Sequence, residues 1–561
     1  MSRDKKSIFI TFNISEGNKY KINSVDVVGD VPFEEEIYKE IIESLEDSTY
    51  SQAQITGIEE FFINVLGNRG YAFAEVAGNP EIDDESNEVK IIFSVQPGNR
   101  TYTRKILFTG NDITQDQVLR REMRQFEGAW TSDNAIEAGK VRLERLGYFK
   151  EVNVETIPVP GTDDQIDISY SVEEETTGSI GGNVGYSDFG LMLGFNLQEQ
   201  NFLGSGNTVG IGINKNVYSE MYNISYMNPY ATRDGVSLGY NLYFRETDYG
   251  EFNVANYLTN SSGFGAQFGY PISDITRLGF NITYDKTDID IGSLPAREIY
   301  DFVSAEGNVF ETISAQLSWQ RVTLNRGLFP TDGASTVLSF SSTIPGSDLN
   351  YYRLNIRQRF YQPLTQSLVF GFQGELGYLD AYGETEETPF FQNFYAGGPR
   401  SLRGFESNTL GPRSTDAPCY EFNYAEGTCP NLLDTDGDGE LDSPYYNPYA
   451  NQTSRYRDAP IGGNIKIEGS LQLIFKLPFI EDQRSLRSAL FFDFGNVFSD
   501  NCKEYQINCS EPSIDELRYS YGVGVTWITG FGPMSLAIAK PTNAGPRERT
   551  EEFQFTVGNV F

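Results

Sequence analysis

The residues that could carry chemistry are few and unevenly placed in this sequence of 561 residues. The sequence has no histidine, which removes histidine acid–base catalysis, Ser-His-Asp and Cys-His nucleophiles, and histidine metal sites. Its four cysteines form two close pairs in polar loops, Cys419 with Cys429 and Cys502 with Cys509. Because the CxxC spacing of a structural zinc site is missing, we expect two local disulfides formed in an oxidising compartment.

One acidic stretch offers oxygen ligands at the spacing of a calcium loop. The sequence DTDGDGELD (434–442) has Asp at the first, third, fifth and ninth positions and Gly at the sixth, but Tyr445 takes the twelfth place, where such loops carry glutamate. The candidate ligands are Asp434, Asp436, Asp438, Glu440 and Asp442. Two interpretations stay open: a Ca²⁺ site with a dissociation constant of about 10⁻⁴ to 10⁻³ M, sufficient outside a cell, and a flexible acidic loop without metal.

Arg403 is a charged residue in a stretch that predicts a loop. Residues 401–413 read SLRGFESNTLGPR, which is rich in Gly, Ser, Asn and Pro. A guanidinium in a confined site gains more from a bidentate carboxylate than an exposed pair does. The alternative is an arginine that faces solvent.

The composition excludes several classes of protein. A formal net charge of −35 argues against a nucleic-acid binder, which needs an excess of Lys and Arg. The sequence contains no run of about 18 apolar residues, so we expect no membrane-spanning helix. Residues 8–14 (IFITFNI) are too short and too regularly alternating for a signal peptide. The 55 Gly, 34 Tyr and 40 Phe residues favour sheets, either in an ordinary all-β protein or in a transmembrane barrel.

Two copies of one unit precede the barrel-like part of the chain. Residues 17–98 and 99–175 each begin with an alternating strand, continue with two helix-like segments and a Gly-Tyr, and close with two strands. The predicted order is β-α-α-β-β. In the second copy, Thr114 with Gln117 has the spacing of a capping box, and an apolar pattern continues to Phe126. Residues 1–16 would end a preceding copy.

After residue 176 the sequence alternates in the manner of membrane strands. SLGYNLYFR (237–245) places aromatic and aliphatic residues on one face, and RLNIRQRFY (353–361) sets Arg353, Arg357 and Arg359 opposite its apolar face. A barrel gives such arginines a polar lumen. Residues 176–561 have the length for about 16 antiparallel strands with long loops. We therefore predict an all-β transmembrane barrel that follows two α+β domains.

The chain ends on an aromatic strand, EEFQFTVGNVF (551–561). Phe553, Phe555, Val557 and Phe561 share one face, and Gly558 interrupts the strand. Terminal strands of this kind close outer-membrane barrels, and glycine there weakens pairing or allows a kink.

The sequence resembles the BamA family of Omp85-type outer-membrane insertases over essentially its whole length. The matching segments are QVLRREMRQFEGAW (117–130), RGLFPTDG (326–333), TIPGSD (343–348), QNFYAGGPRSLRGF (392–405), IGGN (461–464) and the terminal strand. The resemblance implies that the two repeats are the fourth and fifth POTRA domains, and that three more would precede them. It also implies an outer-membrane location in a Gram-negative bacterium, with the POTRA domains in the periplasm.

The resemblance gives Arg403 a role in the sixth loop, about 396–460, here called loop 6. The segment is similar to the family's VRGF motif at the tip of this loop, folded into the lumen, and comprises Leu402, Arg403, Gly404 and Phe405. The family's arginine contacts acidic residues of the barrel wall. By similarity one is Asp493, whereas the second position is Gln472 in place of glutamate. Glu468 has the same parity along its strand and is a candidate substitute.

The function implied by the resemblance is insertion of unfolded barrel proteins through a weak seam between the first and last strands, by addition of a client strand. No enzyme activity or cofactor is expected. Glu127 in QFEGAW matches the glutamate that meets the lipoprotein BamD; the alternative is a surface charge at a helix end. The expected partners are BamD and other Bam lipoproteins, unfolded outer-membrane proteins and the lipid bilayer.

Three other functions stay open. A polypeptide secretion pore of the same family shares the repeats and the RGF loop, and would conduct ions. An insertase for autotransporters is a related possibility. An outer-membrane hydrolase would need a nucleophile motif that the sequence does not show.

Overall fold

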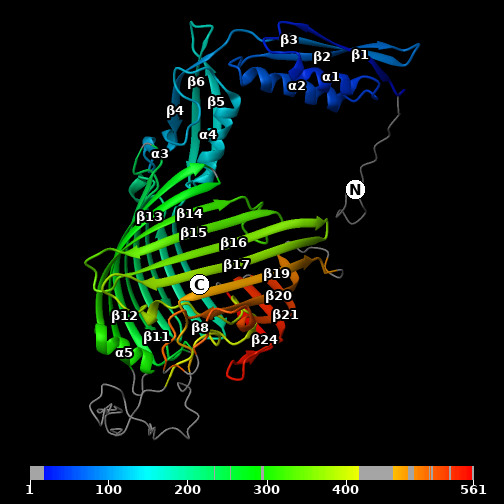
Figure 1. The fold of residues 1–561 in the computed structure, drawn as a ribbon. Helices are drawn as coiled ribbons and strands as arrows, with labels where there is room; N and C mark the ends of the chain where they lie inside the picture. Colours follow the sequence, from blue (N-terminus) through cyan, green and yellow to red (C-terminus); the bar gives the residue numbers. More distant parts are fainter. Residues whose placement is uncertain are drawn as a thin grey trace, which may run out of the picture. The chain divides into compact units, whose positions relative to one another are not determined.

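The computed structural model describes residues 18–558, except 233, 253, 274, 292–295, 416–458, 478–479, 481–484, 505, 507–508 and 530–531. The chain forms two compact units (Figure 1). The first comprises Met1–Thr177 with Leu203–Gly206, and the second Gly178–Phe202 with Asn207–Phe561.

The first unit contains two repeats of the predicted β-α-α-β-β order. The first repeat comprises β1 (Lys21–Gly29), α1 (Glu36–Leu45), α2 (Gln52–Gly67), β2 (Glu75–Asp83) and β3 (Glu88–Gln96). The second comprises β4 (Tyr102–Thr109), α3 (Asp116–Arg120), α4 (Asp133–Arg145), β5 (Phe149–Pro158) and β6 (Gln165–Glu174). In each, the last strand lies in the middle of a three-stranded sheet, parallel to the first strand and antiparallel to the second.

Alternation along the central strands builds the two small cores. In β3 every second residue is buried, namely Val89, Ile91, Phe93 and Val95, and in β6 the same holds for Ile166, Ile168, Tyr170 and Val172. Each buried face packs on the helices of its own repeat. The hydroxyl of Tyr170 donates to the carbonyl of Ile136 in α4 at 2.8 Å, so this ring is buried without an unsatisfied polar group.

The first helix of the second repeat is shorter than its apolar pattern predicts. α3 ends at Arg120, and the predicted capping box is absent because the Thr114 amide donates instead to the carboxylate of Glu174, at 2.6 Å. Beyond the helix, the side chain of Gln125 donates to the carbonyl of Trp130 and accepts from the amide of Ser132. These bonds satisfy backbone groups of a non-helical segment.

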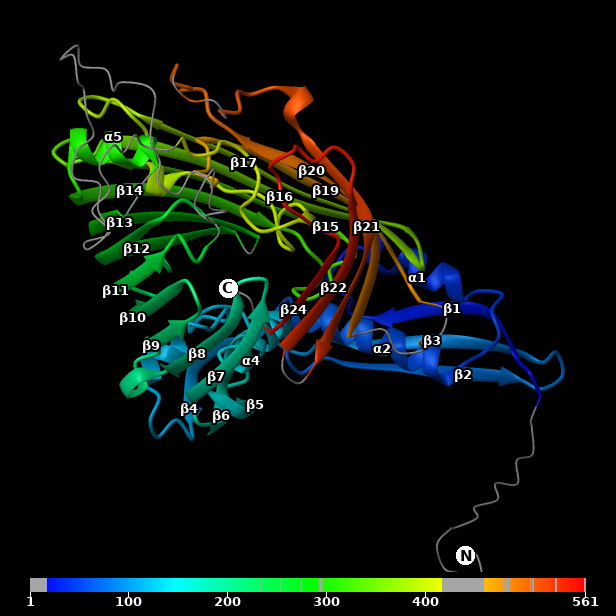
Figure 2. The ribbon, with the colours of Figure 1, turned by 90° about the horizontal axis from the view of Figure 1, so that it is seen from below.

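The second unit is a closed barrel of sixteen strands, as predicted. Every neighbouring pair is antiparallel, and each strand pairs with the next along the chain (Figures 1 and 2). The strands are β7 (Gly178–Ser187), β8 (Gly190–Glu199), β9 (Thr208–Lys215), β10 (Ser219–Asn228), β11 (Ser237–Asp248), β12 (Tyr257–Ser273), β13 (Thr276–Ile291), β14 (Val309–Val322), β15 (Gly333–Thr343), β16 (Tyr351–Thr365), β17 (Leu368–Ala381), β19 (Ile465–Phe475), β20 (Leu486–Phe498), β21 (Arg518–Thr529), β22 (Gly532–Pro541) and β24 (Phe553–Val557).

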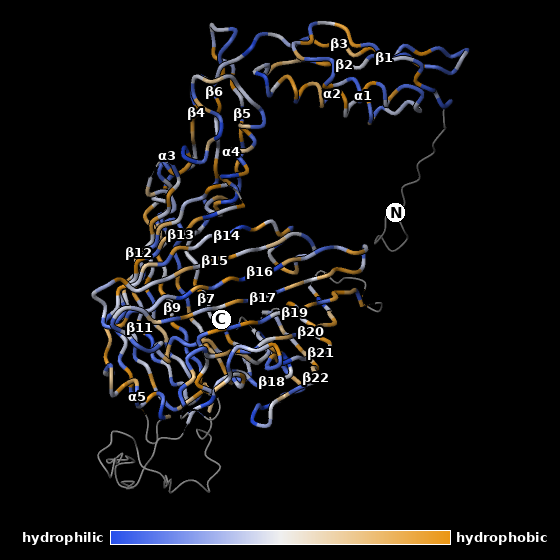
Figure 3. The backbone as a smooth tube through the Cα atoms, viewed as in Figure 1, coloured by the Kyte–Doolittle hydropathy of each residue, from blue (hydrophilic) through white to orange (hydrophobic). Residues whose placement is uncertain are grey.

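The barrel strands present an apolar outer face and a polar inner face. In β11 the side chains of Tyr240, Leu242 and Phe244 are exposed on the outside, and Figure 3 shows hydrophobic and hydrophilic residues alternating along the barrel strands. Among the described residues, no helix has the length and apolar character needed to cross a membrane. The remaining short elements are α5 (Arg297–Glu306), β18 (Gly404–Phe405), β23 (Thr550–Glu551), and three short 3₁₀ turns, η1 (Phe202–Gly204), η2 (Phe390–Gln392) and η3 (Ile514–Glu516).

Candidate functional site: the loop 6 motif and the barrel seam

Arg403 is held against the inner wall of the barrel by Asp493. Its Nε and Nη2 atoms each donate to one oxygen of the Asp493 carboxylate at 2.7 Å, and its backbone amide donates to the same carboxylate at 3.2 Å. Nη2 also donates to Ser470 Oγ at 2.9 Å, and the guanidinium carbon lies 3.4 Å from the ring centroid of Phe491. Asp493 is fully buried, so the pair satisfies a charge that would otherwise be costly.

The strand register explains why these groups meet. Ser470 in β19 and Asp493 in β20 are direct cross-strand partners. Phe491 lies two residues from Asp493 and shares its inward face, whereas Leu490 and Phe492 are exposed on the outer face. One level of the inner wall therefore supplies a carboxylate, a hydroxyl and an aromatic face to one guanidinium.

The residues around Arg403 fix the backbone of the motif. Leu402 and Phe405 are buried in one apolar cluster with Leu410 and Val497. Gly404 has φ of +91°, and a Cβ atom there would lie 3.1 Å from the Cβ of Ala539 and 3.3 Å from Pro541. Glycine therefore suits both the backbone conformation and the close approach to β22.

Glu468, the candidate substitute for the second acidic partner of Arg403, pairs with other groups in this structure. Glu468 instead contacts the hydroxyl of Ser401 and pairs with Lys466 at 3.0 Å. Lys466 lies two residues along the same inward face and also lies 3.6 Å from Glu375. Arg403 reaches the wall at the level of Ser470, one inward-facing position away from Glu468, so a different carboxylate–cation pair forms there.

Gln472 is not a direct partner of Arg403 either. Its Nε2 atom donates to Ser470 Oγ at 3.2 Å, and that hydroxyl accepts from Arg403. The second carboxylate implied by the resemblance is thus replaced by a hydroxyl, with the amide of Gln472 behind it. The sequence reasoning missed Ser470, although its parity with Gln472 was visible.

Gln554 links the motif directly to the last barrel strand. Its Oε1 atom accepts from the Gly404 amide at 3.3 Å, and its Nε2 donates to the Phe405 carbonyl at 2.8 Å. Gln554 is only 2% exposed. Gly404 and Phe405 also pair as β18 with Glu551 and Thr550 of β23, just before β24. The sequence reasoning missed this link, although a lone Gln between Phe553 and Phe555 was a signal of an inward-facing polar group.

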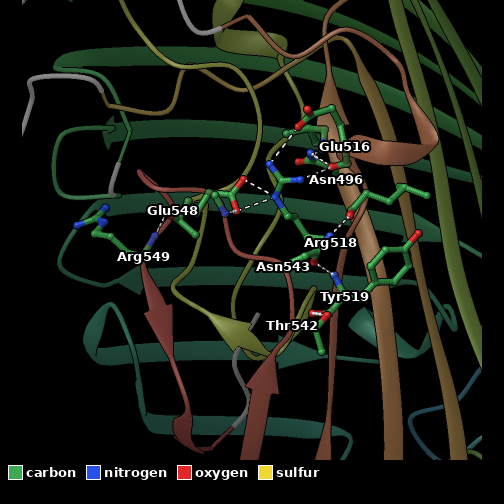
Figure 4. Close-up of polar contacts among 12 residues, drawn as sticks. Asn496, Glu516, Arg518, Tyr519, Thr542, Asn543, Glu548 and Arg549 are labelled. Atoms are coloured by element: carbon green, nitrogen blue, oxygen red, sulfur yellow. Dashed lines mark hydrogen bonds and ion pairs between the residues drawn. The ribbon is translucent and has the colours of Figure 1, made fainter.

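A second ion cluster fastens the segment that leads into β23 (Figure 4). The Nε atom of Arg518 donates to both oxygens of Glu548, at 2.8 and 2.7 Å, and its Nη2 donates to Glu516 at 3.0 Å. The next residue, Arg549, donates its backbone amide to Thr409 Oγ1 at 2.9 Å. The segment is therefore bonded to β21 on one side and to loop 6 on the other.

The described residues of the last and first strands meet at one register pair. Val557 of β24 pairs with Tyr186 of β7, whereas β7 pairs with β8 along its whole length. Gly558 follows with φ of +84°, and a Cβ atom there would lie 2.7 Å from the Val184 carbonyl oxygen. Its amide donates to the carbonyl of Pro533 at 2.9 Å, next to the register pair of Met534 with Val557, so at this residue the chain still lies beside β22 and close to β7. Phe553 and Phe555 lie in β24, and Phe561 lies outside the described residues.

Glu127 lies in the second repeat, on the segment between α3 and α4. Its Oε1 atom accepts from the Ile106 amide at 2.8 Å and from Arg120 Nη1 at 3.2 Å. The side chain is half-exposed. It therefore buttresses β4 within its own repeat while one face of the carboxylate stays accessible.

Only part of the expected covalent and metal chemistry lies in the described residues. Cys502 and Cys509 form a disulfide in the connection between β20 and β21. Cys419, Cys429 and the acidic stretch 434–442 lie outside the described residues. Elsewhere, the described part of the chain holds no group of three or more carboxylates or cysteines placed to bind a metal ion.

The comparisons with known proteins agree with this architecture. The signature of the Omp85 superfamily domain matches residues 201–561, and that of the POTRA repeat, described as a surface antigen variable number repeat, matches residues 20–98 and 101–175. The outer membrane protein assembly factor BamA of Neisseria meningitidis is 29% identical over the whole chain, which spans 69% of that relative.

Two solved structures are similar in fold. The crystal structure of Haemophilus ducreyi BamA lacking POTRA domains 1–3 has 31% sequence identity and a TM-score of 0.78, covering 96% of this chain and 99% of that one. CdiB from Escherichia coli has 13% identity and a TM-score of 0.51, covering 98% and 92%, which shows a shared fold alone. The chain belongs to the Omp85 superfamily, as an outer-membrane β-barrel preceded by two periplasmic POTRA domains.

Proposed function

We propose that this protein folds and inserts β-barrel proteins into the outer membrane, and that clients enter at the seam between β24 and β7. The observation that carries the proposal is that the described residues of β24 and β7 share a single register pair. Most of β7, from Gly178 to Gly185, faces the seam without a partner among the described residues of β24. An unpaired edge of this kind is a template for strand addition.

The relatives support assembly as the activity. The Neisseria meningitidis relative is named an outer membrane protein assembly factor. A short apolar belt beside the seam would thin the bilayer locally and lower the barrier to insertion. A client strand would then exchange its pairing with β7 for pairing within its own barrel.

Loop 6 is proposed to hold the last strand in its closed position from inside. The chain of contacts runs from Asp493 to Arg403, through Gly404 and Phe405, and to Gln554 of β24. Movement of β24 away from β7 would either break these bonds or carry the motif with it. The motif is thus a positioning element of the insertase, with no covalent chemistry.

The POTRA repeats are proposed to recruit clients and lipoproteins. Glu127 is the proposed contact for an arginine of a BamD-type lipoprotein, because both of its hydrogen bonds within the chain use Oε1 and a carboxylate can accept further bonds through its second oxygen. A Glu127→Gln variant should weaken capture of such a lipoprotein and leave the barrel folded. Equal capture by the variant and the parent would remove this contact.

The function itself is tested by the folding of a client. An unfolded outer-membrane barrel is added to liposomes that contain this chain, and the formation of its heat-resistant band is followed over time. We expect faster folding than in empty liposomes. Absence of acceleration by a folded chain, together with a large ion conductance in planar bilayers, would favour a secretion pore instead.

A further inference from the structure

A luminal cavity lies against barrel strands other than β19 and β20, the two strands that hold Arg403. It has a volume of about 470 Å³ and lies among the inner faces of β13, β14, β15 and β16, with Gln392 of η2 on the loop side. Volumes of a few hundred Å³ are typical of small-ligand sites. The cavity therefore has room for a bound molecule between the wall and the segment that leads into loop 6.

The charge of this cavity is opposite to that of the chain. Its described lining includes Arg353 and Arg357 and no carboxylate, although the sequence carries a net charge of −35. Arg357 pairs with Glu375 at 3.1 Å, and Glu375 also accepts from Asn355 at 2.7 Å. No ion pair joins Arg353 to a carboxylate of the described residues; its guanidinium lies 4.1 Å from the ring centroid of Phe394.

The rest of the lining supplies neutral hydrogen-bond donors. Hydroxyl groups come from four neighbouring strands, β13 to β16, and an amide comes from Gln316 of β14. The hydroxyl groups that line the cavity include those of Thr283, Ser314, Ser339, Ser341 and Tyr351. Hydroxyl and amide donors beside a guanidinium fit the acceptor oxygens of a phosphate or a carboxylate. A cation would instead meet two arginines.

We propose that this cavity binds a small oxyanion, a phosphate or carboxylate compound, through Arg353, with Arg357 and the hydroxyl groups completing the site. The bound anion satisfies the charge of Arg353 in a confined space, where such a bond is stronger than at an exposed surface. Because Arg353 also stacks on Phe394, the anion stabilises the segment that enters loop 6. This site is independent of the seam and of the contacts of Arg403.

The test uses the full chain folded in detergent micelles at fixed ionic strength. Calorimetric titrations with inorganic pyrophosphate and with succinate separate phosphate from carboxylate recognition. We expect saturable binding of at least one anion near one per chain, and affinity weaker by about tenfold or more in Arg353→Gln. The matched control is Arg321→Gln, which removes one positive charge from an exposed arginine of β14 outside the cavity.

Two results would overturn the site. One is the absence of saturable binding of both anions to the parent chain, and the other is equal affinity in Arg353→Gln and Arg321→Gln. If Arg353→Gln lacks the heat-resistant mobility of a folded barrel, crystals of the parent soaked in selenate decide the question. An anomalous peak within hydrogen-bond distance of Arg353 supports the proposal, and no peak there refutes it.

Discussion

Replacing Arg403 by alanine should release the loop 6 motif from the barrel wall. The change removes the two bonds from Nε and Nη2 to Asp493, the bond to Ser470 and the stacking on Phe491. Asp493, which is fully buried, is then left without its cation. Breaking one side of a buried ion pair costs about 3 to 5 kcal/mol, so docking of the motif should weaken by a factor on the order of 10² to several times 10³.

Hydrogen exchange at the Phe405 and Gly404 amides measures this docking directly. We expect protection at Gly404, whose amide donates to Gln554, to fall by that factor, up to the limit set by global stability. Protection in Arg403→Lys should lie between that of the parent and that of Arg403→Ala, since an ammonium keeps the charge and loses the bidentate geometry. Arg359→Ala, which removes an exposed arginine of β16, is the control. Unchanged protection of the Gly404 amide in Arg403→Ala would show that this ion pair does not hold the motif.

Three further predictions concern neighbouring groups. Gln554→Leu removes the bonds of Gln554 to the Gly404 amide and the Phe405 carbonyl. The Gly404 amide loses its side-chain acceptor, at about 1 to 3 kcal/mol, whereas the Phe405 carbonyl keeps the Gly398 amide as a donor; exchange at β24 should accelerate, and an unchanged rate would show that the link does not hold the strand. Gly404→Ala places a side chain at φ +91° and 3.1 Å from Ala539, and should lower the free energy of unfolding by about 1 to 2 kcal/mol. Gly128→Ala, at a positive φ in open space, separates the conformational cost from the steric one. Burial raises the pKa of Glu298 in α5, although the Thr415 amide and Gln506 donate to its carboxylate. A pKa that is raised in the folded state stabilises the fold at pH values below the unfolded-state pKa of about 4.3. This stabilisation is lost as the pH rises through the folded-state pKa. Glu298→Gln should therefore flatten the pH dependence of α5 exchange, and an equally steep profile in the variant would assign it to another group.

The periodic features of the sequence predicted most of the fold. Alternation in segments such as 237–245 reports which face meets lipid, because a strand reverses its side chains at every residue. The duplicated β-α-α-β-β order was visible because both copies repeat their turns and closing strands. The apolar pattern to Phe126 overstated α3, since the Gln125 side chain binds backbone groups of a non-helical segment. Local pattern does not report such bonds.

Of the contacts of Arg403, only the ion pair with a single carboxylate could be predicted from the sequence. The resemblance placed Arg403 beside Asp493, and the structure brings them together. The resemblance does not say which residue of β19 lies beside the motif. Parity along the strand allows Glu468 as well as Ser470, and in the structure Arg403 contacts Ser470. This contact depends on the cross-strand register of Ser470 with Asp493 and on the preference of Lys466 for Glu468. Both are tertiary properties that parity along a single strand does not report.

Entry of clients through the seam can be tested by a reversible lock across it. Cysteines at Tyr186 and Val557, the residues that pair β7 with β24, would form a disulfide that holds the seam closed. The measurement is the folding rate of an unfolded barrel in liposomes that contain the Tyr186→Cys, Val557→Cys variant, oxidised and reduced, beside the parent chain under both conditions. We predict that only the oxidised variant loses the acceleration and that reduction restores it. Equal acceleration by the oxidised and reduced variant, with the cross-link verified, would contradict entry through the seam.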